Sequence, residues 1–117
     1  MRDTERPQFY HRDGTPIAGQ SVLDWAIEFE KKKERIVRQE KNIWGEKIST
    51  VFLGLDHNYG LDGPPLIFET MVFHKGGSDC FMDRYSTEAE AIHGHEHAVK
   101  LSYFPRWIRR HLFSGWY

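Results

Sequence analysis

Two apolar runs, joined by a loop rich in glycine and proline, constrain the fold of this chain more than any other feature. The runs are residues 49–55 (STVFLGL) and residues 66–74 (LIFETMVFH), and both are rich in β-branched or aromatic residues. Such composition favours β-strands, and runs this short suit strands better than helices. Neither face of the second run is polar, which predicts a central strand covered on at least one face.

Neighbouring segments predict further strands. Residues 80–85 follow a glycine-containing turn and predict a hairpin with the second run, and residues 8–11 precede an Asp-Gly turn signal. Residues 34–41 have two interpretations. Their β-branched residues and a turn at 42–45 favour a strand, but their Arg, Gln, Glu and Lys residues would also suit a long helix.

Two segments carry helix-start signals. Ser21 is a candidate N-cap for a helix over residues 22–34. Thr87 and Glu90 have the spacing of a capping box that opens a second helix. Pro105 then begins a short basic and aromatic segment, which predicts a C-terminal helix.

These elements predict an α+β fold, with an antiparallel sheet of four to five strands, two main helices packed on it and a short C-terminal helix. A chain of 117 residues, 39% of them hydrophobic, can bury one core, so we expect a single domain over residues 1–117. We expect residues 1–7 to fray and residues 103–117 to form a basic aromatic tail.

Composition excludes several classes of function. The net charge of −1 provides no global basic field for nucleic acid. The single cysteine, Cys80, allows no intrachain disulfide and no Cys-based zinc site, and we expect its thiol to be inert. No apolar stretch approaches the roughly 20 residues of a membrane span, and the first residues lack the apolar segment of a secretion signal. We therefore expect a soluble protein of a reducing cytoplasm.

Polar residues at the ends of the two runs form one candidate site. Asp56 and His57 follow the first run, Glu69 interrupts the second, and His74 ends it. Carboxylate and imidazole groups at strand ends could act as acid and base or hold a divalent metal such as zinc. The protein would then be a metal-dependent hydrolase or nuclease.

The same residues have a structural interpretation. Asp56 or Asn58 could satisfy backbone groups of the Gly-rich turn, and we favour this interpretation. Glu69 could pair with a cross-strand cation such as Arg38 or Lys47, and nothing in the sequence decides between pairing and chemistry.

Alternating histidines in the second predicted helix form another candidate metal site. His93 and His97 have the i, i+4 spacing of HExxH sites, and a third ligand could come from His57, His74 or Glu69. The segment lacks the Glu of that motif at the second place. We therefore favour an exposed polar helix face and no resident cofactor.

The C-terminal tail combines arginines with apolar residues. Arg106, Arg109 and Arg110 are expected on one side of a helix, and Trp107 and Leu112 on another. Such a helix could dock an acidic partner, a nucleic-acid backbone or a membrane surface. We favour the plainer arrangement, in which Trp107 and Leu112 pack on the domain and the arginines face solvent.

A binding pocket is the alternative to catalysis. His57, Asn58, Tyr59 and Glu69 could combine with the arginines and Trp107 of the tail. An aromatic ring beside guanidinium groups suits a nucleotide or an acidic protein surface.

Several motifs resemble a known family. These are Asp13-Gly14, Trp25, STVFLGLDH at 49–57, GPPLIFETMVF at 63–73 and DRYST at 83–87. They are similar to the pattern of a family of small uncharacterised bacteriophage and prophage proteins, over most of the chain up to about residue 100. The resemblance implies a phage-borne accessory protein in the host bacterial cytoplasm, and it implies no particular reaction.

We therefore expect a small binding protein that acts on a host protein or protein complex, or that sequesters a small nucleotide. Counter-defence, such as inhibition of a CRISPR complex, is the concrete form of this expectation. Membrane binding is not expected, and direct binding of nucleic acid is less favoured. The alternatives are the metal-dependent hydrolase or nuclease and a virion or assembly component, which would oligomerise, for example as a dimer.

Overall fold

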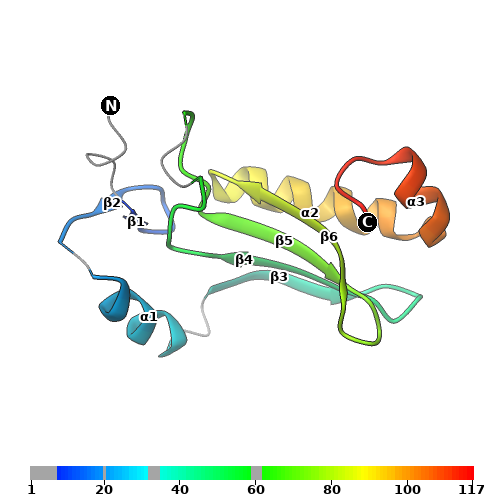
Figure 1. The fold of residues 1–117 in the computed structure, drawn as a ribbon, viewed down its shortest axis with the longest axis horizontal. Helices are drawn as coiled ribbons and strands as arrows, with labels where there is room; N and C mark the ends of the chain where they lie inside the picture. The colour runs from blue at the N-terminus through cyan, green and yellow to red at the C-terminus, as the bar shows by residue number, and fades with distance from the viewer. Residues whose placement is uncertain (1–7, 20, 32–34, 59–61) are drawn as a thin grey trace.

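The computed structural model describes residues 8–19, 21–31, 35–58 and 62–117, so the predicted fraying of residues 1–7 lies outside the described chain. The elements in chain order are strands β1 (Phe9–Tyr10) and β2 (Pro16–Ile17), helix α1 (Val22–Lys31), strands β3 (Ile36–Lys41), β4 (Lys47–Phe52), β5 (Phe68–Phe73) and β6 (Asp79–Tyr85), and helices α2 (Glu88–Ser102) and α3 (Arg106–Leu112). The molecule is elongated, with extents of 45 × 31 × 23 Å (Figure 1). None of the described helices has the length and apolar character needed to cross a membrane.

The main sheet confirms the predicted α+β class. Its strand order is β3-β4-β5-β6 and every pair is antiparallel, while β1 and β2 form a separate hairpin. The open question about residues 34–41 is answered for its described part, because β3 is a strand. The prediction of a central strand is also confirmed, because β5 lies between β4 and β6.

Helix α2 covers one face of the main sheet and contacts all four of its strands (Figure 1). Its buried residues recur at helical spacing, and three of them are small, which lets the helix lie close to the sheet; they are Ala91, His95, Ala98 and Ser102. Two clusters of apolar residues form the core. One contains Ile48, Val72 and Phe81, and the other contains Ile67 and Phe68.

The predicted local signals have the expected geometry. Thr87 and Glu90 form the complete capping box of α2, and the Ser21 hydroxyl accepts a hydrogen bond from the Asp24 backbone at 3.1 Å. These caps satisfy backbone donors that have no partner within a helix. Because each signal depends on residues within one turn, it is readable before any tertiary contact is known.

Gly94 in the middle of α2 has a packing reason. A Cβ atom at this position would lie 2.3 Å from the Tyr85 hydroxyl oxygen, which is far below a van der Waals contact. Glycine weakens an isolated helix by about 1 kcal/mol relative to alanine. Glycine is needed here because α2 lies so close to the end of β6 that a Cβ atom would overlap Tyr85.

The C-terminal residues are an integral part of the domain. The Trp116 ring packs on Phe81 with centroids 4.6 Å apart, and the Tyr117 backbone donates a hydrogen bond to the Cys80 carbonyl at 2.8 Å. One end of the molecule contains the β3–β4 turn, the β5–β6 turn, the last turn of α2 and all of α3 (Figure 1). We call this region the α3 end.

Candidate functional site

Asp56 and His57 hold the connection between β4 and β5. Oδ1 of Asp56 accepts hydrogen bonds from the backbone nitrogens of Asn58 at 2.8 Å and Leu66 at 3.1 Å. Nδ1 of His57 lies 2.8 Å from the carbonyl oxygen of Leu55. These contacts match the favoured structural interpretation, in which the polar residues shape the turn.

The rest of this loop is held in the same way. The Asn58 amide donates to the carbonyl of Pro64 at 3.0 Å, which spans the turn from one side to the other. Tyr59, the aromatic residue expected in a pocket here, lies outside the described residues.

Glu69 forms an ion pair across the sheet. Its direct neighbour on β6 is Arg84, whose Nε lies 3.0 Å from Oε2 of Glu69, and both side chains are mostly buried. The expected partners were wrong, since Arg38 instead pairs with Glu96 on α2, and Lys47 lies over the ring of Phe73. Strand order and register decided the partner, because β3 is not adjacent to β5, and Lys47 on β4 lies opposite Phe73.

The structure does not gather the predicted metal ligands into one group. His57 precedes β5 and His74 follows it, and a six-residue strand separates them by roughly 20 Å. His93 and His97 are exposed on α2, as the polar-face interpretation predicted. The described parts of the β4–β5 connection, residues 56–58 and 62–66, lie at the opposite end of the sheet from α3 (Figure 1), so these residues and the arginines of α3 do not line one pocket.

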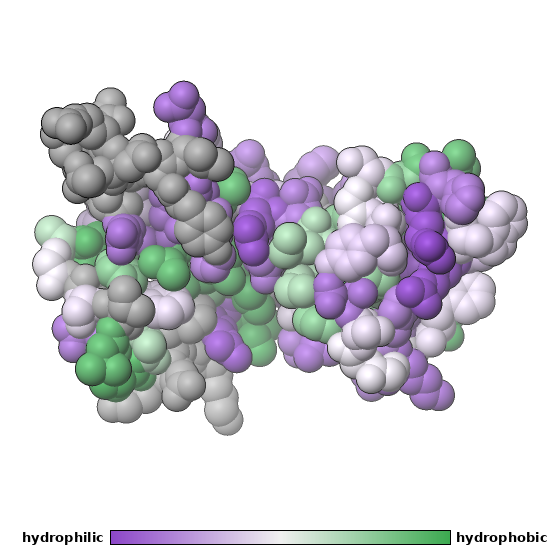
Figure 2. Space-filling view, in the orientation of Figure 1, coloured by the Kyte–Doolittle hydropathy of each residue, from purple (hydrophilic) through white to green (hydrophobic). Residues whose placement is uncertain are grey.

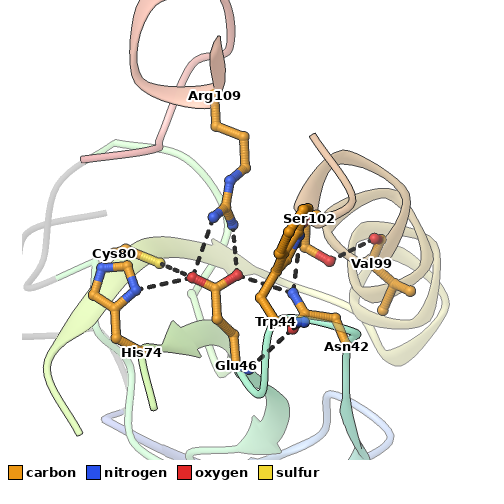
Figure 3. Close-up of polar contacts among 8 residues, drawn as sticks. All are labelled: Asn42, Trp44, Glu46, His74, Cys80, Val99, Ser102 and Arg109. Atoms are coloured by element: carbon orange, nitrogen blue, oxygen red, sulfur yellow. Dashed lines mark hydrogen bonds and ion pairs between the residues drawn. The ribbon is translucent and has the colours of Figure 1, made fainter. Parts of the chain in front are cut away.

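A buried polar cluster instead surrounds Glu46, at the α3 end (Figure 3). The Arg109 guanidinium binds both oxygens of the Glu46 carboxylate, at 2.9 Å and 3.1 Å. The Asn42 amide donates to Oε1 and Nδ1 of His74 to Oε2, each at 2.9 Å. Two-pronged charge-assisted bonds of this kind are the strong ones, and they fix the carboxylate in one orientation.

The β3–β4 turn positions Glu46. Oδ1 of Asn42 accepts hydrogen bonds from the backbone nitrogens of Trp44 at 3.0 Å and Glu46 at 2.9 Å. Gly45 has a φ of +76°, which favours glycine. The Trp44 indole donates to the Ser102 carbonyl at 2.8 Å, so the turn is attached to the end of α2.

Two titratable groups of this cluster have pKa values shifted from their ordinary values. Burial by itself would raise the pKa of the Glu46 carboxyl, but hydrogen bonds from Arg109, Asn42 and His74 outweigh burial and lower the pKa below 4.5. Burial and the neighbouring Glu46 charge raise the pKa of the Cys80 thiol to about 11. The thiol is therefore protonated at neutral pH and is a poor nucleophile, as expected for an inert cysteine.

Glu46, His74 and Cys80 also form a potential metal-ligand group. Their donor atoms lie within 4.8 Å of one another. A zinc ion would require a thiolate and a free lone pair on the carboxylate. Arg109 already covers both carboxylate oxygens, and the raised pKa of the Cys80 thiol opposes formation of the thiolate. The donors therefore fit a metal only if Arg109 leaves, and the arrangement described is an ion-paired cluster.

A second array links a buried hydroxyl and a buried imidazole to an exposed carboxylate. His95 on α2 lies 2.7 Å from the Thr50 hydroxyl and 2.7 Å from Oε1 of Glu40. The order of groups resembles a nucleophilic triad, but Thr50 and His95 are fully buried. A nucleophile must reach its substrate. This array therefore satisfies polar groups under α2, and His95 is a core residue.

The arrangement predicted for the C-terminal helix is wrong for Arg109 and for the apolar residues, although Arg106 and Arg110 are exposed as expected. Arg109 is buried, with 2% of its surface exposed, and its guanidinium lies over the Trp116 ring at 4.8 Å. Trp107 and Leu112 are 68% and 72% exposed. Arg109 is buried because its guanidinium pairs with the Glu46 carboxylate, and a buried carboxylate without a cation would be strongly destabilising.

Charge is concentrated at the α3 end. Residues 41–47, 74–79 and 100–117 form this end and contain seven basic residues, Lys41, Lys47, Lys75, Lys100, Arg106, Arg109 and Arg110. They contain two acidic residues, Glu46 and Asp79. The net charge of −1 for the whole chain therefore conceals a basic end and an acidic remainder.

A surface cleft of about 420 Å³ opens beside the Glu46 cluster. Its walls come from the β3–β4 turn, the β5–β6 turn and α3. The lining residues are Trp44, Glu46, His74, Lys75, Gly76, Pro105, Arg106 and Arg109. The sequence singled out His74, Arg106 and Arg109 from this set, although it grouped them with a loop at the other end of β5.

Comparison with known proteins adds no relative: no family model, curated protein or solved structure matches the chain. The resemblance to phage proteins therefore stays a prediction. Sequence reasoning missed Asn42, Trp44 and Glu46 as site residues. The turn signal at 42–45 located them on a loop, but no local pattern indicated that the loop meets α3.

Proposed function

We propose that this protein is a non-enzymatic binding protein whose α3 end docks onto an acidic surface of a partner protein. The observation that carries the proposal is the placement of side chains on α3, which buries Arg109 and leaves Trp107 and Leu112 in solvent. Large apolar groups left exposed beside charged groups are typical of interaction surfaces.

The exposed residues have the composition of an interface. We define the docking surface as Tyr103, Phe104, Trp107, Arg110 and Leu112, all of which are exposed. Tryptophan, tyrosine and arginine are the residues most enriched among those that dominate binding energy. Trp107 and Arg110 are therefore the residues from which we expect the largest contribution.

Charge selects the class of partner. The basic residues at the α3 end would attract an acidic protein surface and accelerate its association. The right-hand side of Figure 2 shows hydrophilic residues beside less polar ones on this end of the molecule. Mixed apolar and cationic character suits a folded acidic protein better than a phosphate backbone alone.

The phage resemblance supports the same proposal. A small protein that binds a host protein in the bacterial cytoplasm would act by occupying the partner's surface. Inhibition of a defence complex, such as a CRISPR complex, is the form of this function that the resemblance favours. It is an argument by association, since folds and families do not determine function.

Affinity capture from a bacterial lysate, followed by reconstitution with each identified partner in purified form, tests the proposal. The matched variants are Leu112→Ala on the docking surface and Leu23→Ala on α1, since these leucines are 72% and 69% exposed. We expect Leu112→Ala, Trp107→Ala and Arg110→Glu to weaken the purified complex, each by about tenfold or more. Leu23→Ala should bind as the wild type does.

Two results would overturn the proposal. One is a purified complex whose affinity is unchanged in all three variants of the docking surface. The other is a finding that the protein binds single-stranded oligonucleotides through these residues in a salt-dependent manner and binds no acidic protein.

A further inference from the structure

We propose that the cleft beside the Glu46 cluster binds a nucleoside phosphate, with the base on Trp44 and the phosphate between Lys75 and Arg106. This proposal goes beyond the docking function, since the cleft is lined by residues outside the docking surface. Its basis is an imbalance of charge around one buried carboxylate.

The Glu46 carboxylate has no capacity left for further cations. Its two oxygens accept two hydrogen bonds from Arg109, one from Asn42, one from His74 and a longer one of 3.9 Å from the Cys80 thiol. A carboxylate offers about four acceptor positions, so these bonds leave none for a further donor. The one negative charge in the cleft is therefore already matched by Arg109.

Two further cations line the same cleft. Lys75 comes from the β5–β6 turn and Arg106 from the first turn of α3, and both are exposed. Neither forms an ion pair with any residue in the described part of the chain. With Arg109 neutralised by Glu46, the lining carries a net excess of two positive charges, which an anion from outside would balance.

Trp44 gives the cleft a rigid aromatic wall. The indole nitrogen is held by the Ser102 carbonyl at 2.8 Å, and the Trp44 backbone nitrogen is held by Asn42 at 3.0 Å. The Trp44 residue is nevertheless 46% exposed. A ring fixed by its edge and open elsewhere is prepared for stacking, because little rotamer freedom remains to be lost on binding.

Size and lining decide the ligand class. A volume of about 420 Å³ lies in the range of small-molecule sites. A carboxylate or phosphate alone would contact the cations and leave Trp44 and Pro105 uncovered. A ligand with a flat ring and an anionic group uses both parts of the cleft, and nucleoside phosphates have both.

Calorimetric titration with AMP, adenosine and inorganic phosphate tests the proposal, because the last two are the halves of the first. We expect AMP to bind at least about tenfold more tightly than either half. Trp44→Ala should lose about tenfold in AMP affinity, while Trp44→Phe should keep most of it. Lys75→Gln and Arg106→Gln should each weaken AMP and phosphate binding together.

Controls separate this site from the docking surface. Trp107→Ala and Leu112→Ala should leave AMP affinity unchanged, whatever they do to a protein partner, and thermal melting verifies that each variant folds. A short single-stranded oligonucleotide that binds more tightly than AMP, with the same dependence on Trp44, would identify a nucleic-acid terminus as the source of the nucleoside phosphate.

Three outcomes would overturn the inference. They are no AMP binding at about 1 mM protein and ligand, AMP binding that Trp44→Ala leaves intact, and displacement of AMP to the docking surface as shown by sensitivity to Trp107→Ala. None of these outcomes would affect the docking proposal, whose variants lie outside the cleft.

Discussion

The Arg109 guanidinium forms a two-pronged ion pair with the Glu46 carboxylate, and the two buried residues are 63 positions apart in sequence. This contact attaches α3 to the β3–β4 turn. It also decides which side of α3 faces solvent, and so it shapes both the docking surface and the cleft.

Breaking this pair on one side should be strongly destabilising. Arg109→Met leaves the Glu46 carboxylate buried without its cation, and we expect a loss of about 3–5 kcal/mol in the free energy of unfolding. The double variant Glu46→Gln/Arg109→Met should recover part of that loss, because no charge remains buried. Urea denaturation of the two single variants and the double variant measures the coupling. Independent, additive effects would contradict the assignment.

Stability should depend on pH through Glu46. The pKa of this carboxyl is lowered in the folded protein, so the ionised form stabilises the fold above the ordinary value of 4.5. This contribution is lost as the pH falls from 4.5 through the lower folded pKa. Urea denaturation between pH 7 and pH 3 should therefore show a smaller acid-induced loss in Glu46→Gln than in the wild type. Parallel curves for the two proteins would argue against the lowered pKa.

Alanine at position 94 should destabilise the protein, although helix propensity alone predicts a gain of about 1 kcal/mol. The added Cβ would overlap the Tyr85 hydroxyl, and overpacking of this kind costs about 1–3 kcal/mol. The Tyr85→Ala background removes the overlap, so Gly94→Ala should become neutral or stabilising there. Thermal melting of the wild type, the two single variants and the double variant tests this reversal, and a stabilising Gly94→Ala in the wild-type background would disprove the clash.

Zinc should not stabilise the protein. Arg109 occupies both oxygens of Glu46, and the raised pKa of the Cys80 thiol, about 11, opposes formation of the thiolate that zinc requires. We expect equal melting temperatures with added zinc and after treatment with EDTA. Stoichiometric zinc that is lost in Cys80→Ser would show instead that Arg109 yields its place to the metal.

The elements that could be predicted depend on neighbours in sequence. The capping box of Thr87 and Glu90, the turn at 42–45 and the strand character of β5 follow from residues a few positions apart. Steric preference and backbone hydrogen bonding act at that range, so composition and spacing reveal them. The α+β class followed from the order of these elements.

The ion-pair partner of Glu69 could not be predicted from the sequence. The sequence indicated a cross-strand cation, but strand order and register selected Arg84 over Arg38 or Lys47. A one-residue change of register moves a side chain to the other face of a sheet, so the pattern of one strand cannot identify its partner.

By itself, the sequence determined most of the strands, turns and helices, because those choices depend on local steric and hydrogen-bonding preferences, but it left residues 34–41 open between strand and helix. Only the tertiary structure decided that Glu46 meets Arg109, that Trp44 is attached to the end of α2, and that α3 turns Trp107 outward. The physical reason is that a buried carboxylate requires a cation, and chain folding alone determines which distant arginine reaches it.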